Sequence, residues 1–179
     1  MRRSRRLMLR ILGAVVIKLA PLIKPGLATR ASVFFYGRLG MRFHGEPNYL
    51  SARINFDGTD YSLIEIGQGV TISSYVRVLT HNWALNTIVR SMGVSSDNPI
   101  GRVSGVYIGE FSFVGTGSVI TPGARIGRGC LIGAGTVVRG EVPDYSIVIG
   151  SPGTIVGDTR GLAARQFKRQ GLDASALNR

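Results

Sequence analysis

The apolar residues between positions 108 and 142 recur at an unbroken spacing of six. A branched aliphatic residue opens each hexad, and a small residue, or valine in the last hexad, follows it four positions later. The aliphatic positions are Ile108, Val114, Ile120, Ile126, Ile132 and Val138, and the small positions are Ser112, Ser118, Ala124, Cys130, Thr136 and Val142. A fixed short period of this kind predicts a solenoid, in which each repeat buries its apolar residue only by stacking on the next turn.

Glycine follows the aliphatic residue in four of these hexads, at Gly109, Gly115, Gly127 and Gly133. Glycine accepts turn geometry and lets two backbones approach closely, as a stack of coils requires. A shorter run in the same style predicts one earlier coil, with aliphatic positions Ile66, Ile72 and Val78 and small positions Val70 and Val76. From about 43 to 65 the pattern is degenerate. We therefore expect the solenoid to span residues 43–156, with its most regular part from 106 onwards.

The pairing of an aliphatic position with a small position in each hexad resembles the repeat of the hexapeptide-repeat acyltransferases. The chain is similar in particular to sugar and polysaccharide O-acetyltransferases. The resemblance implies an all-β solenoid, a left-handed parallel β-helix with three hexads in each triangular coil. The left hand comes from the family, because ordinary parallel crossovers are right-handed. The resemblance also implies an acetyl-CoA-dependent enzyme that works as a homotrimer, with its cleft between neighbouring subunits.

Composition agrees with a single glycine-rich domain. Of the 179 residues 25 are glycine, about twice the usual share of roughly 7%. The single cysteine, Cys130, excludes an internal disulfide framework and fits a reducing compartment. Its place at a small, inward position favours core packing over a role as a catalytic thiol. We expect a cytoplasmic protein, which can also lie peripherally on the inner face of the cell membrane.

Basic residues collect at the two ends of the chain. Residues 1–42 contain ten Lys and Arg and no Asp or Glu, residues 43–156 contain seven basic and eight acidic residues, and residues 157–179 contain five basic and two acidic ones. The ends therefore carry all of the excess in the formal net charge of +12. We expect a basic amphipathic N-terminal helical segment, a neutral β-helix and a short basic C-terminal tail, and the charge favours a docking function for the ends.

The first segment is mostly apolar from residue 7 to residue 23, although Arg10 and Lys18 interrupt it. Its longest uncharged stretch, 11–17, is far shorter than the roughly 20 residues that span a bilayer. At about 100° per residue, a helix here places three arginines on one narrow stripe beneath a broad apolar face, namely Arg3, Arg6 and Arg10.

Pro21 and Pro25 end this predicted helix, and two interpretations of it stay open. Either residues 1–24 lie in a membrane interface, where anionic lipids attract the basic residues, or the helix packs on the β-helix with its charges in water. A twin-arginine export signal over residues 4–10 is disfavoured, because charge breaks the apolar region and no A-x-A site follows. Nucleic-acid binding is also disfavoured, since no aromatic platform or recognised module accompanies the arginines.

The repeat is interrupted between residues 79 and 107, and a long insertion into a regular scaffold is usually a functional loop. In the resembled family such a loop projects over the cleft between subunits, and a histidine at its start is the catalytic base. His81 matches that position. Acyl transfer from a thioester to a hydroxyl needs a group that accepts the hydroxyl proton near neutral pH, and imidazole suits this task. The thiolate leaves readily, so no covalent enzyme intermediate is required.

The other histidine, His44, is expected to be a surface or packing residue. Two histidines fall short of the three that a zinc-dependent carbonic anhydrase on the same fold would use, so we expect no metal. Asn82 follows His81 where many relatives have aspartate or proline. The group that orients the imidazole must therefore be a carboxylate from elsewhere in the chain or a backbone carbonyl.

The resemblance implies that acetyl-CoA lies along the groove between subunits, held largely by backbone groups. The matching positions are Gly115, Thr116, Gly133 and Ala134, with Arg139 where relatives often place a basic residue near the CoA phosphates. A backbone N–H at one of these turns can also stabilise the tetrahedral oxyanion. The same residues are ordinary turn formers, and that structural role holds whether or not CoA binds.

Two residues are candidates for binding the acceptor. Asn55 lies where sugar-acetylating relatives place a substrate-binding polar residue, and Trp83 can stack on a sugar face. A turn role for Asn55 and a loop-anchoring role for Trp83 are equally open. We expect direct acetyl transfer, in a ternary complex, to a hydroxyl of a small-molecule or lipid-linked saccharide or of an envelope polysaccharide precursor. The alternatives are an N-acetyltransferase acting on an amino-sugar nucleotide and a non-catalytic, membrane-docked β-helix scaffold.

Overall fold

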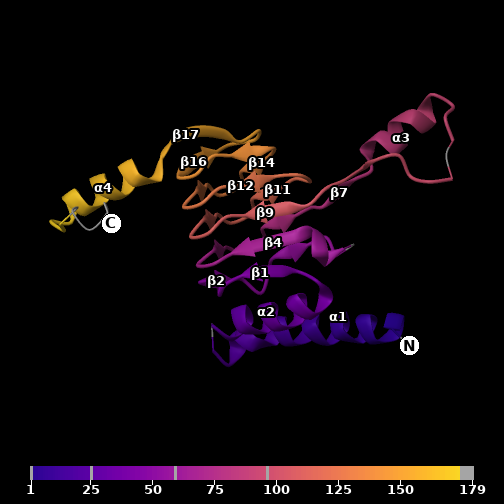
Figure 1. The fold of residues 1–179 in the computed structure, drawn as a ribbon, viewed down its shortest axis with the longest axis horizontal. Helices are drawn as coiled ribbons and strands as arrows, with labels where there is room; N and C mark the ends of the chain where they lie inside the picture. Colours follow the sequence, from indigo (N-terminus) through magenta and orange to yellow (C-terminus); the bar gives the residue numbers. More distant parts are fainter. Residues whose placement is uncertain (1, 25, 59, 96, 174–179) are drawn as a thin grey trace.

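The structure is a computed structural model that describes residues 2–24, 26–58, 60–95 and 97–173. The side chains at positions 2 and 3, and with them the predicted place of Arg3, lie outside the described residues, as does the predicted helix breaker Pro25. Two helices at the N-terminal end are followed by a stack of short strands, a projecting excursion with a helix, and a strand and helix at the C-terminal end (Figure 1).

Three parallel sheets form the faces of the stack. The first face contains β1 (Arg42–His44), β4 (Ile64–Gly67), β9 (Val106–Ile108), β12 (Arg125–Ile126) and β15 (Glu141–Val142). The second face contains β2 (Tyr49–Leu50), β5 (Thr71–Ile72), β10 (Phe113–Val114), β13 (Leu131–Ile132), β16 (Ser146–Ile149) and, antiparallel at its edge, β17 (Thr154–Asp158). The third face contains β3 (Asn55–Phe56), β6 (Arg77–Val78), β11 (Val119–Ile120) and β14 (Val137–Val138). Because the chain visits the three faces in rotation, each circuit forms one coil of a solenoid.

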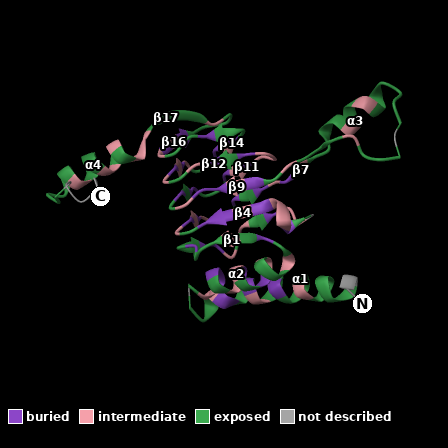
Figure 2. Cartoon of the chain, in the orientation of Figure 1, coloured by how far each residue is buried: buried purple, intermediate pink, exposed green. Residues whose placement is uncertain are grey.

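The predicted period sets the coil length. Val114 pairs with Ile132 and Ile120 pairs with Val138, so each regular coil advances the chain by three hexads. All six predicted aliphatic side chains are at most 1% exposed, and the six small positions are at most 6% exposed. The buried residues of Figure 2 accordingly run as a column through the stack. The predicted core and the predicted earlier coil are therefore confirmed.

The first coil is longer than the regular coils that follow the excursion, which explains its degenerate pattern. Leu50 pairs with Ile72, and the chain between them is longer than the three hexads of a regular coil. Part of the extra length is a 3-10 helix at a corner, η2 (Tyr61–Leu63). The strands β1, β2 and β3 nevertheless continue all three faces, because an inward apolar residue is kept on each of them.

The N-terminal segment folds as two helices, α1 (Arg2–Leu19) and α2 (Leu27–Leu39), joined through a short 3-10 turn, η1 (Ala20–Leu22). As predicted, α1 ends before Pro21. The second helix was not predicted, since its buried side includes Thr29 and Ser32 and so lacks a continuous apolar stripe. Among the described residues, no helix combines the length and hydrophobicity that crossing a bilayer requires.

Helix α2 covers the open end of the first coil. The Tyr36 ring lies 5.0 Å from the Phe56 ring and 5.2 Å from the Tyr61 ring, measured between centroids, and the Leu50 backbone N–H donates to the Thr29 hydroxyl at 2.9 Å. Burial raises the pKa of Tyr36 to about 12. Helix α1 then packs on α2, where a Cβ at Gly13 would lie 2.9 Å from a ring carbon of Phe35.

The expectation of a short C-terminal tail is corrected by the structure. The chain from Thr159 to Arg169 forms a helix, α4, which begins directly after β17. Asp158 caps it, because its carboxylate accepts hydrogen bonds from the backbone N–H groups of Arg160 and Gly161 at 2.8 and 3.4 Å. The hydrogen bonds from the Arg160 side chain lower the pKa of Asp158 to about 2. The helix was missed because it buries no residue and so has no core-facing stripe.

Loss of one interior aliphatic group should destabilise the whole stack. We expect Ile126→Ala, at a fully buried position, to lower the free energy of unfolding by about 2–5 kcal/mol, because it removes apolar contacts and leaves a cavity. Ile155→Ala, at a position that is 51% exposed, should change it by less than about 0.5 kcal/mol. Denaturant unfolding followed by circular dichroism measures both values. Equal losses would show that the interior column does not dominate stability.

Candidate active site

The chain leaves the solenoid after β6 and rejoins it at β9. Ile72 pairs with Val114, so this step along the second face takes seven hexads of chain where a regular coil takes three. At the base of the excursion β7 (His81–Asn82) pairs antiparallel with β8 (Arg102–Val103), and α3 (Ala84–Ser91) lies in its outer part (Figure 1). The predicted interruption is therefore present, although it contains a helix and the first face resumes at Val106 rather than after residue 107.

His81 lies at the base of this excursion, above a carboxylate from the coil before it. The His81 Nδ1 atom is 3.0 Å from Oδ2 of Asp57, whose side chain is 6% exposed while that of His81 is 27% exposed. Asp57 comes directly after the inward Phe56 of β3, and Phe56 pairs with Val78 of β6. The stacking of one coil on the next therefore brings two residues 24 positions apart in the sequence into contact.

Thr80 fixes the carboxylate of Asp57. The Thr80 hydroxyl donates to the Asp57 carboxylate, with its oxygen 2.7 and 2.9 Å from the two carboxylate oxygens, and the Thr80 backbone N–H also donates to Oδ2. A carboxylate held in this way accepts a hydrogen bond from Nδ1–H, which leaves Nε2 as the basic nitrogen of the neutral ring. The indole of Trp83 lies beside the imidazole, with 5.7 Å between ring centroids and 34° between ring planes.

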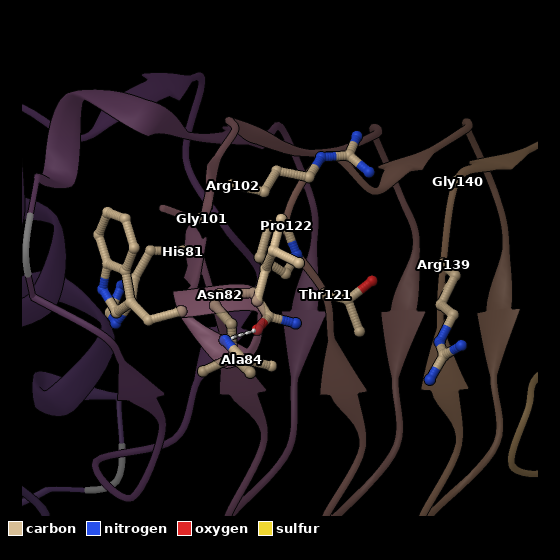
Figure 3. Close-up of a pocket in the computed structure, with 12 residues that line it drawn as sticks. His81, Asn82, Ala84, Gly101, Arg102, Thr121, Pro122, Arg139 and Gly140 are labelled. Carbon is tan, nitrogen blue, oxygen red and sulfur yellow. Dashed lines mark hydrogen bonds between the residues drawn. The ribbon is translucent and has the colours of Figure 1, made fainter. Parts of the chain in front are cut away.

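A pocket of about 840 Å³ opens beside His81 (Figure 3). Its lining includes His81 and Trp83 from the excursion, Thr121 from the corner after β11, and two arginines, Arg102 and Arg139. The size is within the range of small-molecule sites. An imidazole and two guanidinium groups on the wall of one pocket suit a ligand that carries both a reacting hydroxyl or thioester and negative charge.

Known proteins share both the repeat and the fold. Residues 105–140 match the family model described as bacterial transferase hexapeptide (six repeats). The chain is 32% identical over 136 residues to a Schizosaccharomyces pombe protein named as a candidate acetyltransferase, covering 74% of this chain and 57% of that protein. It is 28% identical over 118 residues to the galactoside O-acetyltransferase of Lactococcus lactis, covering 66% and 54%. The chain belongs to the hexapeptide-repeat acetyltransferase family.

A solved structure supports the fold of this hexapeptide-repeat protein. The hexapeptide-repeat containing acetyltransferase of Vibrio cholerae, complexed with acetyl coenzyme A, superposes with a TM-score of 0.53 at 22% identity, covering 85% of this chain and 87% of that one. At this identity the likeness establishes the fold. The chain spans 31–57% of the length of four curated relatives that it matches.

The predicted site residues of this hexapeptide-repeat protein fall into three places. His81, Trp83 and Arg139 line the pocket. The predicted CoA positions Gly115, Thr116, Gly133 and Ala134 lie instead at the corner between the second and third faces, where the Gly135 backbone N–H donates to the Thr116 carbonyl at 2.8 Å. Asn55 is exposed on β3, pairs with Arg77, and does not line the pocket.

Sequence reasoning missed Asp57, Arg102 and Thr121. Asp57 follows the inward residue of β3 as Leu79 follows that of β6, but the step between the paired residues Phe56 and Val78 is not a whole number of hexads, so counting in sixes does not find it. The sequence pattern does not predict Arg102 either, since its place depends on the antiparallel pairing of Arg102 with Asn82 inside the excursion. The Arg102 guanidinium lies against Gly123, a glycine with φ +84° at the next corner, where a Cβ would lie 2.5 Å from a guanidinium nitrogen.

Two other candidate residues have structural partners. Cys130 is 2% exposed, burial raises the pKa of its thiol, and its Sγ donates to the Pro143 carbonyl at 3.1 Å, in keeping with the packing interpretation. His44 is on β1, where its Nε2 lies 2.8 Å from Glu65 Oε2. In the described ranges, no three His, Cys, Asp or Glu side chains are grouped as ligands of a metal ion.

The two histidines should carry their ring protons on opposite nitrogens when neutral. The carboxylate contacts place the proton of His81 on Nδ1, next to Asp57, and that of His44 on Nε2, next to Glu65. Nitrogen NMR chemical shifts of the imidazole rings distinguish the two forms. We expect Asp57→Asn to remove the Nδ1 preference of His81 and leave His44 unchanged, and Glu65→Gln to do the reverse. A native His81 protonated on Nε2 would contradict the proposed orientation.

Proposed function

We propose that this chain transfers an acetyl group from acetyl-CoA to a sugar hydroxyl, with His81 as the general base. The observation that carries the proposal is the contact between His81 Nδ1 and the buried carboxylate of Asp57, which directs Nε2 to proton transfer beside the pocket. The Lactococcus relative is named a galactoside O-acetyltransferase, and the Vibrio structure contains acetyl coenzyme A. Both support this chemistry over a non-catalytic scaffold.

The reaction follows from the roles of the two side chains. Nε2 of His81 accepts the proton of the acceptor hydroxyl as that oxygen attacks the thioester carbonyl, and Asp57 stabilises the resulting imidazolium. The tetrahedral intermediate collapses when its C–S bond breaks. The imidazolium then returns the proton to the departing thiolate, which leaves as the CoA thiol. The products are the acetyl ester and CoA, and His81 ends in its starting state.

Donor binding involves two corners of the solenoid. Arg102 and Arg139 in the pocket supply positive charge for phosphate groups. The turns at Thr116 and Ala134 supply backbone groups at the other corner, which is separated from the pocket by the strands β11 and β14. A donor that reaches both corners has to run along the third face, which an extended molecule such as CoA can do. We assign the sugar to the part of the pocket next to Trp83, whose exposed indole can stack on it.

We further propose that the solenoid is left-handed and that three copies assemble with α3 against a neighbouring copy. Helix α3 buries none of its own residues, and it presents several apolar side chains that are 50–72% exposed, namely Leu85, Ile88 and, directly after it, Met92. An apolar helix on a projecting excursion needs a partner to cover it. A second copy of this chain provides one and also closes the open side of the pocket.

Replacement of the base should abolish turnover without loss of the fold. We expect His81→Ala to reduce acceptor-dependent release of CoA from acetyl-CoA by about 10²-fold or more, measured with a panel of sugars and amino sugars. His44→Ala is the matched control and should retain native activity, because His44 lies on the first face against Glu65. The acceptor that responds decides between oxygen and nitrogen chemistry. Absence of acetyl-CoA binding by the native chain in a direct titration would refute the transferase proposal.

The assembly can be tested through α3. We expect a native particle of about three times the 19.2 kDa chain mass by light scattering, and Ile88→Asp to lower that mass, because it places a charge at the covered apolar surface. Thr87→Asp changes the charge equally at an exposed polar position of the same helix. A native monomer would refute the trimer, and equal effects of the two variants would show that the apolar surface of α3 does not form the contact.

A further inference from the structure

Helix α1 has two apolar sides, of which only one is used in the fold. Gly13, Ile17 and Ala20 are buried against the rest of the chain, and Gly13 closely approaches Phe35 of α2. The opposite side, here called the outer apolar face, consists of side chains that are 50–61% exposed, namely Leu7, Met8, Ile11, Leu12, Val15 and Leu19. The turn that follows extends it, since Leu22 and Ile23 are 82% and 83% exposed.

The outer apolar face points away from the solenoid. On the other flank of the helix, the Arg10 guanidinium lies 5.5 Å from the Tyr61 ring centroid, at the base of the first coil. Hydrogen bonds from Ser62 lower the pKa of the neighbouring Asp60, and the charges of Arg6 and Arg10 add to this. The predicted arginine stripe therefore faces the protein in part. In Figure 1, α1 lies across the end of the stack, and most of its described residues are exposed, as the colours of Figure 2 show.

The charge around this face has one sign. Residues 1–42 contain ten Lys and Arg and no acidic residue. Arg5, Lys18 and Lys24 are exposed on α1 and the turn after it. A partner that covers the outer apolar face must therefore offer an apolar interior and a negatively charged border. A second copy of the same helix meets the first condition but not the second, because it would bring like charges together.

We propose that α1 docks the protein on an anionic lipid surface, with the outer apolar face lying in the boundary between headgroups and acyl chains. The helix lies in the plane of the surface, as interfacial amphipathic helices do. Lys18 and Arg5 extend to the phosphate groups at the edges of the apolar face. Since α1 lies across the end of the stack, the first coil is held toward the lipid and later coils lead away from it (Figure 1).

This proposal is independent of the transferase proposal and is tested without turnover. The full chain is sedimented with vesicles of phosphatidylcholine alone and with vesicles of equal parts phosphatidylcholine and phosphatidylglycerol. We expect binding at least about tenfold tighter to the anionic vesicles, weakened by added salt. The double variant L12E/V15E should lose at least about tenfold of this binding, because it places two carboxylates on the apolar face.

The matched control is I155E/V156E, which makes the same change at two exposed apolar positions of β17, at the other end of the solenoid. It should bind anionic vesicles like the native chain. Circular dichroism verifies that both variants keep native helix content. Three results would overturn the proposal. The native chain could stay in the supernatant with both kinds of vesicle, or the L12E/V15E variant could bind as well as the native chain. The third is a native particle mass that, without lipid, is larger than that of L12E/V15E, because the outer apolar face would then bind another copy of the chain.

Discussion

The register between successive coils is the constraint on which the rest of the structure depends. In the regular coils every face directs aliphatic side chains into the interior, and these are fully or almost fully buried because the next coil stacks on them in phase. The interruption respects this rule. Val78 and Ile120 are separated by seven hexads of sequence rather than three, yet they pair across the third face as neighbours in the stack. The stack therefore accommodates this insertion because the chain returns to the same phase, and the excursion can project from the solenoid without disturbing the interior.

The same register assembles the candidate active site as a column. The chain turns the same corner after β3, β6, β11 and β14, and at these turns it places Asp57, His81, Thr121 and Arg139. Two of the turns supply the imidazole proposed as the base and the carboxylate in contact with it, and the two later turns contribute to the pocket wall. The strands that lead into these turns, β3, β6, β11 and β14, are only two residues long and pair in register with one another. Stacking thus positions functional groups from distant parts of the sequence without any dedicated loop for each.

How far the sequence predicts this structure depends on whether a residue belongs to the periodic part. The sequence alone predicts Ile126 and Cys130 as inward side chains, because their environment repeats with every third hexad. The presence of the excursion and the position of His81 at its start followed from where the period stops. Asp57 and Arg102 did not follow, since the first contact crosses a coil of irregular length and the second depends on pairing inside the excursion. Helix α2 was hidden for another reason: it buries Thr29 and Ser32 against the first coil, so its apolar period is incomplete.

The two ends of the solenoid face the same physical problem and solve it differently. A terminal coil exposes the edge of the interior column unless something covers it. At the C-terminal end, β17 adds an antiparallel edge to the second face, and α4 extends away with no buried residue. At the N-terminal end, α2 provides ring and hydrogen-bonding contacts that close the first coil. Helix α1 is a second layer on this cap, and a helix needed only to brace α2 requires one apolar side. Its outer apolar face contributes nothing to that packing, and exposed apolar surface carries a solubility cost. The fold therefore accounts for the inner side of α1, and the outer side is the part of the helix for which we propose an anionic lipid surface.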